Sequence, residues 1–195
     1  MITSIFLDLQ SEAIGKKKEI MEKRFEEKLK NVKAFVFDVD GVLSTSSIPL
    51  ALDGTPNRVV STKDGYALHL AAAKGVRLCI ITGGNTQGIR VRFEGLGFQD
   101  IYMGAAKKIK TLNDYVKKEG ITLDDVLFMG DDIPDYECMK ASGLCACPVD
   151  AADEIKAIAD YVSPKAGGQG CVRDVMEKYL KVKGIWMTDV EAFGW

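Results

Sequence analysis

Two aspartates follow an apolar run near the beginning of this 195-residue chain. Asp38 and Asp40 come directly after residues 33–37, and Gly41 follows them. Side chains two positions apart on an extended strand point the same way, so both carboxylates can reach one site. Paired carboxylates repel each other and are costly to bury unless a cation compensates them. The spacing therefore favours a hard, oxygen-binding cation such as Mg²⁺ at the end of this strand.

A second acidic group follows the apolar run 126–129. Gly130 is followed there by Asp131 and Asp132, and Asp135 comes three positions later. In open α/β sheets, ligands bind outside the carboxyl ends of the strands. We therefore expect these acids to lie at the same edge of a sheet as Asp38 and Asp40.

Two further signals suit a phosphate group. Thr82 and Gly83 end the apolar run 76–81, where a hydroxyl group and free backbone N–H groups can bind phosphate oxygens. Lys107 and Lys108 open a later helical pattern, where a cation can neutralise a phosphate or an attacking carboxylate. Each signal alone is also typical of an ordinary surface turn or helix. Their common place after apolar runs predicts one phosphate site.

Short apolar runs alternate with helical patterns along most of the chain, which predicts an α/β fold. We expect a doubly wound, Rossmann-like parallel sheet with helices on both faces. The expected strands are 33–37, 76–81, 101–102, 126–129, 144–147 and 161–162, and the expected helices are 66–74, 86–96, 107–119, 134–141, 151–159 and 172–182.

Three segments depart from this alternation. Residues 48–61, with Asp53 and Gly54 at the turn, predict a β-hairpin within a flap of about 44–62, in place of a cap domain. Residues 14–32 predict an amphipathic helix. We expect an N-terminal extension over 1–31, a catalytic domain over 32–182 and a docked tail over 183–195, which holds both tryptophans.

The composition excludes several classes of function. A net charge of −2 gives no sign of a nucleic-acid partner, and no apolar run reaches the length of a membrane span. The N-terminus is a poor signal peptide, so we expect a cytoplasmic protein. The five cysteines predict buried thiols, and the single histidine, His69, predicts a packing or surface residue.

In their order and spacing, the motifs DVDG, ITG, the lysine and GDDxxD resemble those of the haloacid dehalogenase superfamily of phosphatases, over about residues 32–181. The resemblance implies that Asp38 is the nucleophile and that Asp40 protonates the leaving alcohol and then activates water. It also implies that Thr82, Gly83 and Lys108 bind the phosphoryl oxygens. Lys108 is preferred over Lys107 because of its spacing from Gly104 along the sequence.

The same resemblance implies a metal site and a surrounding layer. Mg²⁺ would be bound by Asp38, by the backbone carbonyl of Asp40 and by Asp131. Asp132 and Asp135 would lie around that shell.

The small flap, residues 63–66 and residues 166–174 are similar to the capless branch of the family, which hydrolyses 3-deoxy-D-manno-octulosonate 8-phosphate on the way to lipopolysaccharide. This implies a sugar-acid phosphate as substrate and a homotetramer formed through the flaps, with each tail reaching a neighbouring site. Lys63 and Arg173 would contact the sugar-acid carboxylate or the subunit interface. Gly84 replaces the arginine usual in the branch, and residues 55–57 also differ, which leaves a nine-carbon sialic-type keto-acid phosphate open as substrate.

Three other readings compete with this one. A phosphorelay receiver domain also places acids, a threonine and a lysine on a doubly wound sheet, but it lacks the DxDG spacing and the GDDxxD strand. An inactive binding module would have to lose catalysis while keeping every core residue. A phosphomutase would carry a substantial cap.

Overall fold

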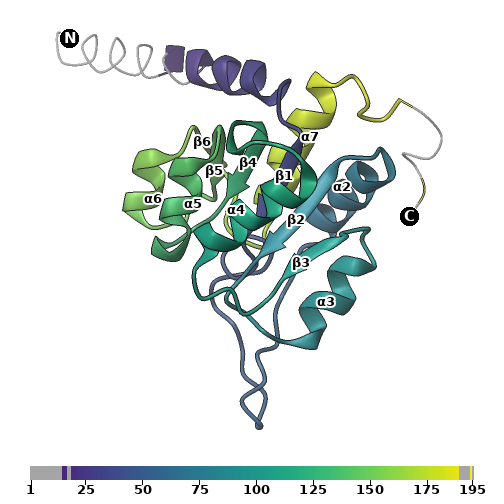
Figure 1. Cartoon of the computed structure of the whole chain (residues 1–195), viewed down its shortest axis with the longest axis vertical. Coiled ribbons are helices and arrows are strands. Elements are labelled where there is room, and N and C mark those ends of the chain that lie inside the picture. The colour runs from purple at the N-terminus through teal and green to yellow at the C-terminus, as the bar shows by residue number, and fades with distance from the viewer. Residues whose placement is uncertain (1–14, 17–18, 189–193, 195) are drawn as a thin grey trace, which may run out of the picture.

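A computed structural model describes residues 15–16, 19–188 and 194 of the chain (Figure 1). The strands form one parallel sheet in the order β3-β2-β1-β4-β5-β6, which confirms the expected fold class. β1 lies between β2 and β4, so the first acidic motif leaves the middle of the sheet. The strands are β1 (Ala34–Phe37), β2 (Arg77–Ile81), β3 (Asp100–Tyr102), β4 (Val126–Met129), β5 (Leu144–Cys147) and β6 (Tyr161–Val162).

Helices cover both faces of the sheet (Figure 1). One face carries α2, α3 and α7, and the other carries α4, α5 and α6. α2 begins four residues earlier than expected, because the Ser61 side chain accepts a hydrogen bond from the backbone N–H of Asp64 and caps it. The helices are α2 (Thr62–Ala73), α3 (Gln87–Glu94), α4 (Lys108–Glu119), α5 (Tyr136–Ala141), α6 (Asp153–Ile158) and α7 (Cys171–Val182), with 3₁₀ turns η1 (Leu123–Asp125) and η2 (Ile133–Asp135).

The strand β1 is apolar throughout because both of its faces are buried. Phe35 and Phe37 pack toward α2 and α7, whereas Ala34 and Val36 pack toward α4 and α5. A parallel strand covered on both sides shows an unbroken apolar run instead of alternation. The polar residue that follows, Asp38, therefore emerges at the edge of a closed core.

The N-terminal helical residues 19–29 attach to this core through a narrow apolar stripe. Phe25 and Leu29 are fully buried, and the Phe25 ring stacks on Tyr161 with ring centroids 4.6 Å apart. Ile14, at the beginning of the expected helix 14–32, lies outside the described residues.

The flap doubles back as expected and projects from the sheet, at the bottom of Figure 1. It does not form two regular strands. Isolated antiparallel bridges pair Leu50 with Pro56 and Ser44 with Val60. Proline has no N–H to donate to a ladder, so the prolines at 49 and 56 interrupt regular pairing.

The beginning of the C-terminal tail docks on the domain. Trp186 packs edge-on against Tyr66 of α2, and the guanidinium of Arg173 lies 4.5 Å from the centroid of a Trp186 ring. The second tryptophan, Trp195, lies outside the described residues.

The remaining expectations from composition can be compared with the structure. All five cysteines are buried free thiols, and His69 is exposed on α2. Among the described residues, no helix combines the length and hydrophobicity that crossing a bilayer requires.

The buried stripe of residues 19–29 gives a stability prediction. Phe25→Ala should lower the free energy of unfolding by about 3 kcal/mol, because it removes a ring packed in the core. Ile20→Ala is the matched control on the same helix, where the side chain is 67% exposed, and should change stability by less than about 0.5 kcal/mol. Urea unfolding measures both, and equal losses would contradict the packing of this helix.

Candidate active site

The carboxyl ends of the central strands bring most of the predicted site residues together. Asp38 follows β1, Thr82 follows β2 and Asp131 follows β4 after one glycine. Lys108 is the first residue of α4, which the chain enters after β3. Asp38, Thr82 and Lys108 are all buried, so they meet where water has little access.

The ammonium group of Lys108 is the charge centre of the site. Its Nζ lies 2.9 Å from Asp38 Oδ2 and 2.8 Å from Asp135 Oδ1. Burial disfavours the charged form of Lys108, but the two carboxylates outweigh it and raise the pKa of the lysine. Lys107 is exposed, so the helix directs the second lysine of the pair to the site.

Asp135 is almost fully buried and is occupied on both oxygens. Oδ1 accepts a hydrogen bond from Lys108, and Oδ2 accepts one from the backbone N–H of Asp131 at 3.1 Å. Burial raises the pKa of Asp135. This carboxylate therefore positions Lys108 and the loop after β4.

Asp131 has an oxygen that protein groups leave without a partner. Its Oδ1 is buried and has no hydrogen-bond partner within the described part of the chain. Burial, with repulsion from Asp38 and Asp135, raises the pKa of Asp131 to about 7. Such an orphaned acceptor is costly unless something else fills the site.

Gly41 makes room for this carboxylate. It has a φ of +90°, and a Cβ built on it would lie 1.9 Å from Asp131 Oδ2. Only glycine combines this backbone conformation with such a close approach. The glycine of the first motif thus allows the two acidic motifs to come together.

The three carboxylates suit a hard cation. Asp38, Asp131 and Asp135 offer oxygens that all lie within 4.8 Å of one another. Burial raises the pKa of Asp38 to about 6, with repulsion from Asp135 adding to it and Lys108 opposing it. Asp38 and Asp131 would hold the ion, with Asp135 already bound to protein donors. Asp132 is exposed and is not a member of this cluster.

The side chain of Asp40 lies outside the acidic cluster and has its own cation. Arg58 of the flap donates from Nε to Asp40 Oδ1 at 2.6 Å and from Nη2 to Oδ2 at 2.8 Å. Ser44 donates to Oδ1 at 3.1 Å. No sequence motif indicates Arg58 as a site residue. Its only indication in the sequence is that a flap which follows the first acidic motif must overhang the site.

The turn after β2 holds a hydroxyl group at the site edge. Thr82 Oγ1 accepts a hydrogen bond from the backbone N–H of Gly84 at 3.0 Å. A hydroxyl that accepts one bond still has its own proton to donate. Gly83 is exposed directly after it, so its backbone is open to a ligand.

Lys63 and Arg173, the expected contacts to a sugar acid, are not part of this cluster. Lys63 is exposed in the first turn of α2. Arg173 donates to Glu177 at 2.8 Å and packs on Trp186. Between them, buried Asp64 accepts the backbone N–H of Arg173 and so anchors α7 to α2.

Known proteins resemble this chain over most of its length. The sequence profile of haloacid dehalogenase-like hydrolases matches residues 93–174. The 3-deoxy-D-manno-octulosonate 8-phosphate phosphatase KdsC of Escherichia coli K12 is 32% identical over 157 residues, covering 80% of this chain and 84% of that protein. The KdsC of Haemophilus influenzae is 26% identical over 159 residues, covering 82% and 88%.

Solved structures show the same similarity. The octulosonate phosphatase of Moraxella catarrhalis, in complex with magnesium, phosphate and KDO, has a TM-score of 0.80 at 32% identity and covers 83% of this chain and 94% of its own. The Yersinia pestis phosphatase has a TM-score of 0.79 at 26% identity, with coverage of 83% and 87%.

The chain belongs to the haloacid dehalogenase-like hydrolases. Within that family, the two KdsC relatives described above are matched over most of their length.

The crowded carboxylates predict an unusual pH dependence of stability. Without a metal, burial raises the pKa of Asp38 to about 6 and the pKa of Asp131 to about 7, whereas the pKa of an aspartate in an unfolded chain is about 4. Because these two carboxyl groups then bind more protons in the folded state, their contribution to stability should be largest below pH 4 and should fall as the pH rises to 7. Mg²⁺ should raise the melting temperature at pH 7.5 more than at pH 5.

The control for this prediction is Asp131→Asn, which removes one charge at nearly the same shape. In chelator, this variant should melt higher than the wild type at pH 7.5 and should lose much of the pH slope. A wild-type melting temperature independent of pH between 4.5 and 7.5 would show that the three carboxylates do not repel one another as the geometry requires.

Proposed function

We propose that the chain is a magnesium-dependent phosphatase of 3-deoxy-D-manno-octulosonate 8-phosphate, acting through a phosphoryl group carried on Asp38. The observation that supports this most is the buried pair of Asp38 and Lys108, which joins a carboxylate to a cation at 2.9 Å beside two further acids. Phosphoryl transfer needs positioning and charge neutralisation above all. The cluster offers both.

In the first step, a carboxylate oxygen of Asp38 attacks phosphorus and the bond to the leaving alcohol breaks. For this step Asp40 carries a proton on an oxygen that Arg58 has released, while its other oxygen stays bound to Arg58. Asp40 gives this proton to the departing oxygen, which is worth about 10²–10⁴-fold in rate. In the second step, Asp40 takes a proton from water, the water oxygen attacks phosphorus, and Asp38 is released with inorganic phosphate. The covalent step divides one hard displacement into two easier ones.

The remaining residues hold the phosphoryl group. Lys108 balances the charge on its oxygens, and Thr82 and the backbone of Gly83 donate hydrogen bonds to them. Asp135 keeps Lys108 in place. Mg²⁺, held by Asp38, the backbone carbonyl of Asp40 and Asp131, would neutralise the phosphoryl oxygens, with Asp132 beyond that shell.

The substrate proposal is supported by relatives. KdsC proteins are named for the eight-carbon substrate, and the Moraxella catarrhalis structure is a complex with magnesium, phosphate and KDO. The corresponding role is a hydrolysis step in lipopolysaccharide biosynthesis. The five buried free thiols are consistent with a reducing cytoplasm as the place of action.

The substrate can be tested by measuring kcat/KM for the eight-carbon and the nine-carbon keto-acid phosphates side by side. We expect the eight-carbon ester to be preferred by at least about 10-fold, and Asp38→Asn to abolish turnover of both. Preference for the nine-carbon ester would assign the chain to sialic-type acids. Activity that survives in Asp38→Asn would contradict the nucleophile.

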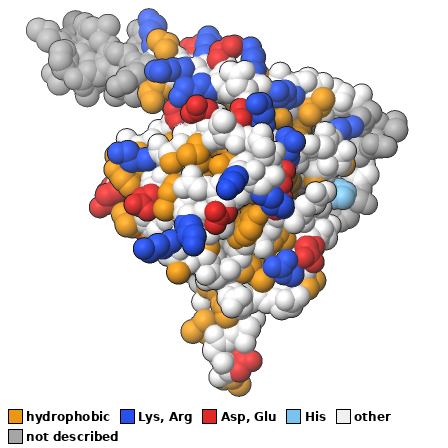
Figure 2. All heavy atoms as spheres, viewed as in Figure 1, with side chains coloured by type: hydrophobic (Ala, Val, Ile, Leu, Met, Phe, Trp, Pro, Cys, Tyr) orange, Lys and Arg blue, Asp and Glu red, His pale blue; other side chains and the backbone are white. Residues whose placement is uncertain are grey.

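We also propose a homotetramer formed through the flaps, with each tail reaching a neighbouring site. Lys63 and Arg173 would contact the sugar-acid carboxylate or the subunit interface. The flap exposes large apolar side chains, Leu50 at 69% and Leu52 fully, and Figure 2 shows hydrophobic groups along this projection. Exposed apolar side chains on a projecting segment suit contact with another chain. Sedimentation equilibrium should give a tetramer for the wild type and smaller species for Leu50→Glu, while a stable wild-type monomer would contradict the assembly.

A further inference from the structure

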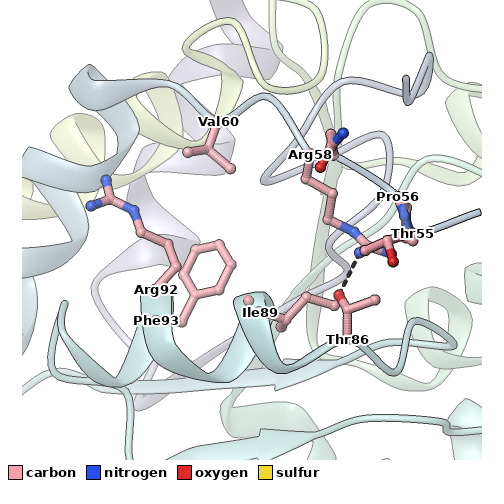
Figure 3. A pocket seen from close by; sticks show the side chains of 10 residues that line it. Thr55, Pro56, Arg58, Val60, Thr86, Ile89, Arg92 and Phe93 are labelled. Atoms are coloured by element: carbon pink, nitrogen blue, oxygen red, sulfur yellow. Dashed lines mark hydrogen bonds between the residues drawn. The ribbon is translucent and has the colours of Figure 1, made fainter. Parts of the chain in front are cut away.

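Arg58 connects the flap to Asp40 in the loop after β1 and to Thr86 at the beginning of α3. Its side chain is only 12% exposed. Besides the two bonds to Asp40, its Nη1 donates to Thr86 Oγ1 at 2.7 Å, which is the dashed line in Figure 3. A guanidinium has five N–H groups in a fixed plane, so these contacts fix the orientation of both Arg58 and the Asp40 carboxylate.

The presence of this guanidinium explains a glycine. Gly84 does not adopt a left-handed backbone conformation, so its backbone does not itself require glycine. A Cβ at this position would, however, lie 2.8 Å from Nη2 of Arg58 and 3.0 Å from Cδ1 of Ile89. Gly84 thus supplies the space that Arg58 occupies, and the two positions are coupled.

Arg58 also lines a pocket between the flap and α3, with a volume of about 420 Å³ (Figure 3). Three of its five N–H groups are used by Asp40 and Thr86, which leaves two for a ligand. Arg92 lines the same pocket, and its buried Nε has no hydrogen-bond partner among the described residues. Val60, Ile89 and Phe93 supply apolar surface in the same pocket.

These donors define the chemistry of what the pocket can take. The two unused N–H groups of Arg58 and the unpaired Nε of Arg92 favour a negatively charged ligand that is rich in oxygen, such as a hydroxylated carboxylic acid. The apolar surface suits the carbon skeleton of such a ligand. Because Arg58 touches Asp40, the group in this pocket would be the part of the substrate attached to the leaving oxygen.

We propose that Arg58 is a positioning residue that aims Asp40 at the leaving oxygen and also binds an acidic leaving group in this pocket, and that Gly84 is glycine to admit it. The second half of this inference rests on the proposed phosphatase function; the first half requires only that Asp40 assists departure of an alcohol.

A pair of aryl phosphates tests the positioning half without the natural substrate. p-Nitrophenolate leaves without much proton donation, whereas phenolate needs it. Arg58→Gln should therefore slow phenyl phosphate by about 10²-fold but p-nitrophenyl phosphate by less than about 5-fold, and Arg58→Lys should fall between wild type and Arg58→Gln. The matched control is Arg77→Gln, which removes an arginine paired with Glu119 at the beginning of β2 and should change neither rate.

A double-mutant cycle tests the coupling to Gly84. Gly84→Ala should reproduce the phenyl phosphate defect when Arg58 is present and should add less than about 2-fold in the Arg58→Gln background. Melting temperatures within a few degrees of the wild type would show that the variants are folded. Equal losses on the two aryl phosphates, or defects at 58 and 84 that simply multiply, would overturn the positioning role.

The recognition half is tested with octulosonate 8-phosphate and with inorganic phosphate as an inhibitor. Arg58→Gln should raise KM for the sugar-acid ester by about 10-fold and leave the inhibition constant of phosphate unchanged within about 2-fold, since phosphate has no leaving group. An unchanged KM would overturn recognition by Arg58. A wild type that does not hydrolyse this ester would instead refute the proposed substrate, while the aryl phosphates still decide the positioning role.

Discussion

The ammonium group of Lys108 lies 2.9 Å from Asp38 and 2.8 Å from Asp135, and Asp131 offers a third carboxylate within 4.8 Å. One positive charge cannot balance three negative ones, so two charges stay uncompensated when all three acids are ionised. Burial makes this imbalance expensive and raises the pKa of both Asp38 and Asp131. The site therefore needs a divalent cation to balance the excess negative charge. Positive charge placed in this way also allows the site to bind a phosphoryl group.

The fold keeps these charges in place by means of the sheet. β1 and β4 are neighbouring central strands. Asp38 follows the apolar run of β1 directly, and Asp131 follows that of β4 after one glycine. Gly41 then leaves room for the Asp131 carboxylate between the two loops, and the hydrogen bond from the backbone N–H of Asp131 to Asp135 fixes the shape of the loop after β4. Rigid strands under a closed core hold such like charges together better than a mobile loop could.

The sequence predicted the strands and the acids well because both follow one strong pattern, an apolar run ending in carboxylates. Only the resemblance to the family favours Lys108 over Lys107 as the site lysine. In the structure, the Lys108 side chain is buried and bonded to Asp135, whereas Lys107 is exposed. Arg58 could not be found in this way. The contact between Arg58 and Asp40 depends on how the flap folds back over the site. The two sides of the flap are joined only by isolated bridges, because its prolines interrupt regular strand pairing, so no strand pattern in the sequence indicates this fold.

The steric course at phosphorus distinguishes a phosphoryl group carried on Asp38 from direct attack by water or an alcohol. A phosphate ester made chiral with the three oxygen isotopes would be transferred by the enzyme to an acceptor alcohol, and the configuration of the product would be read by NMR. Attack by Asp38 followed by attack of the acceptor makes two in-line displacements, so retention of configuration is expected. Inversion would mean a single direct displacement and would contradict a phosphoryl group carried on Asp38.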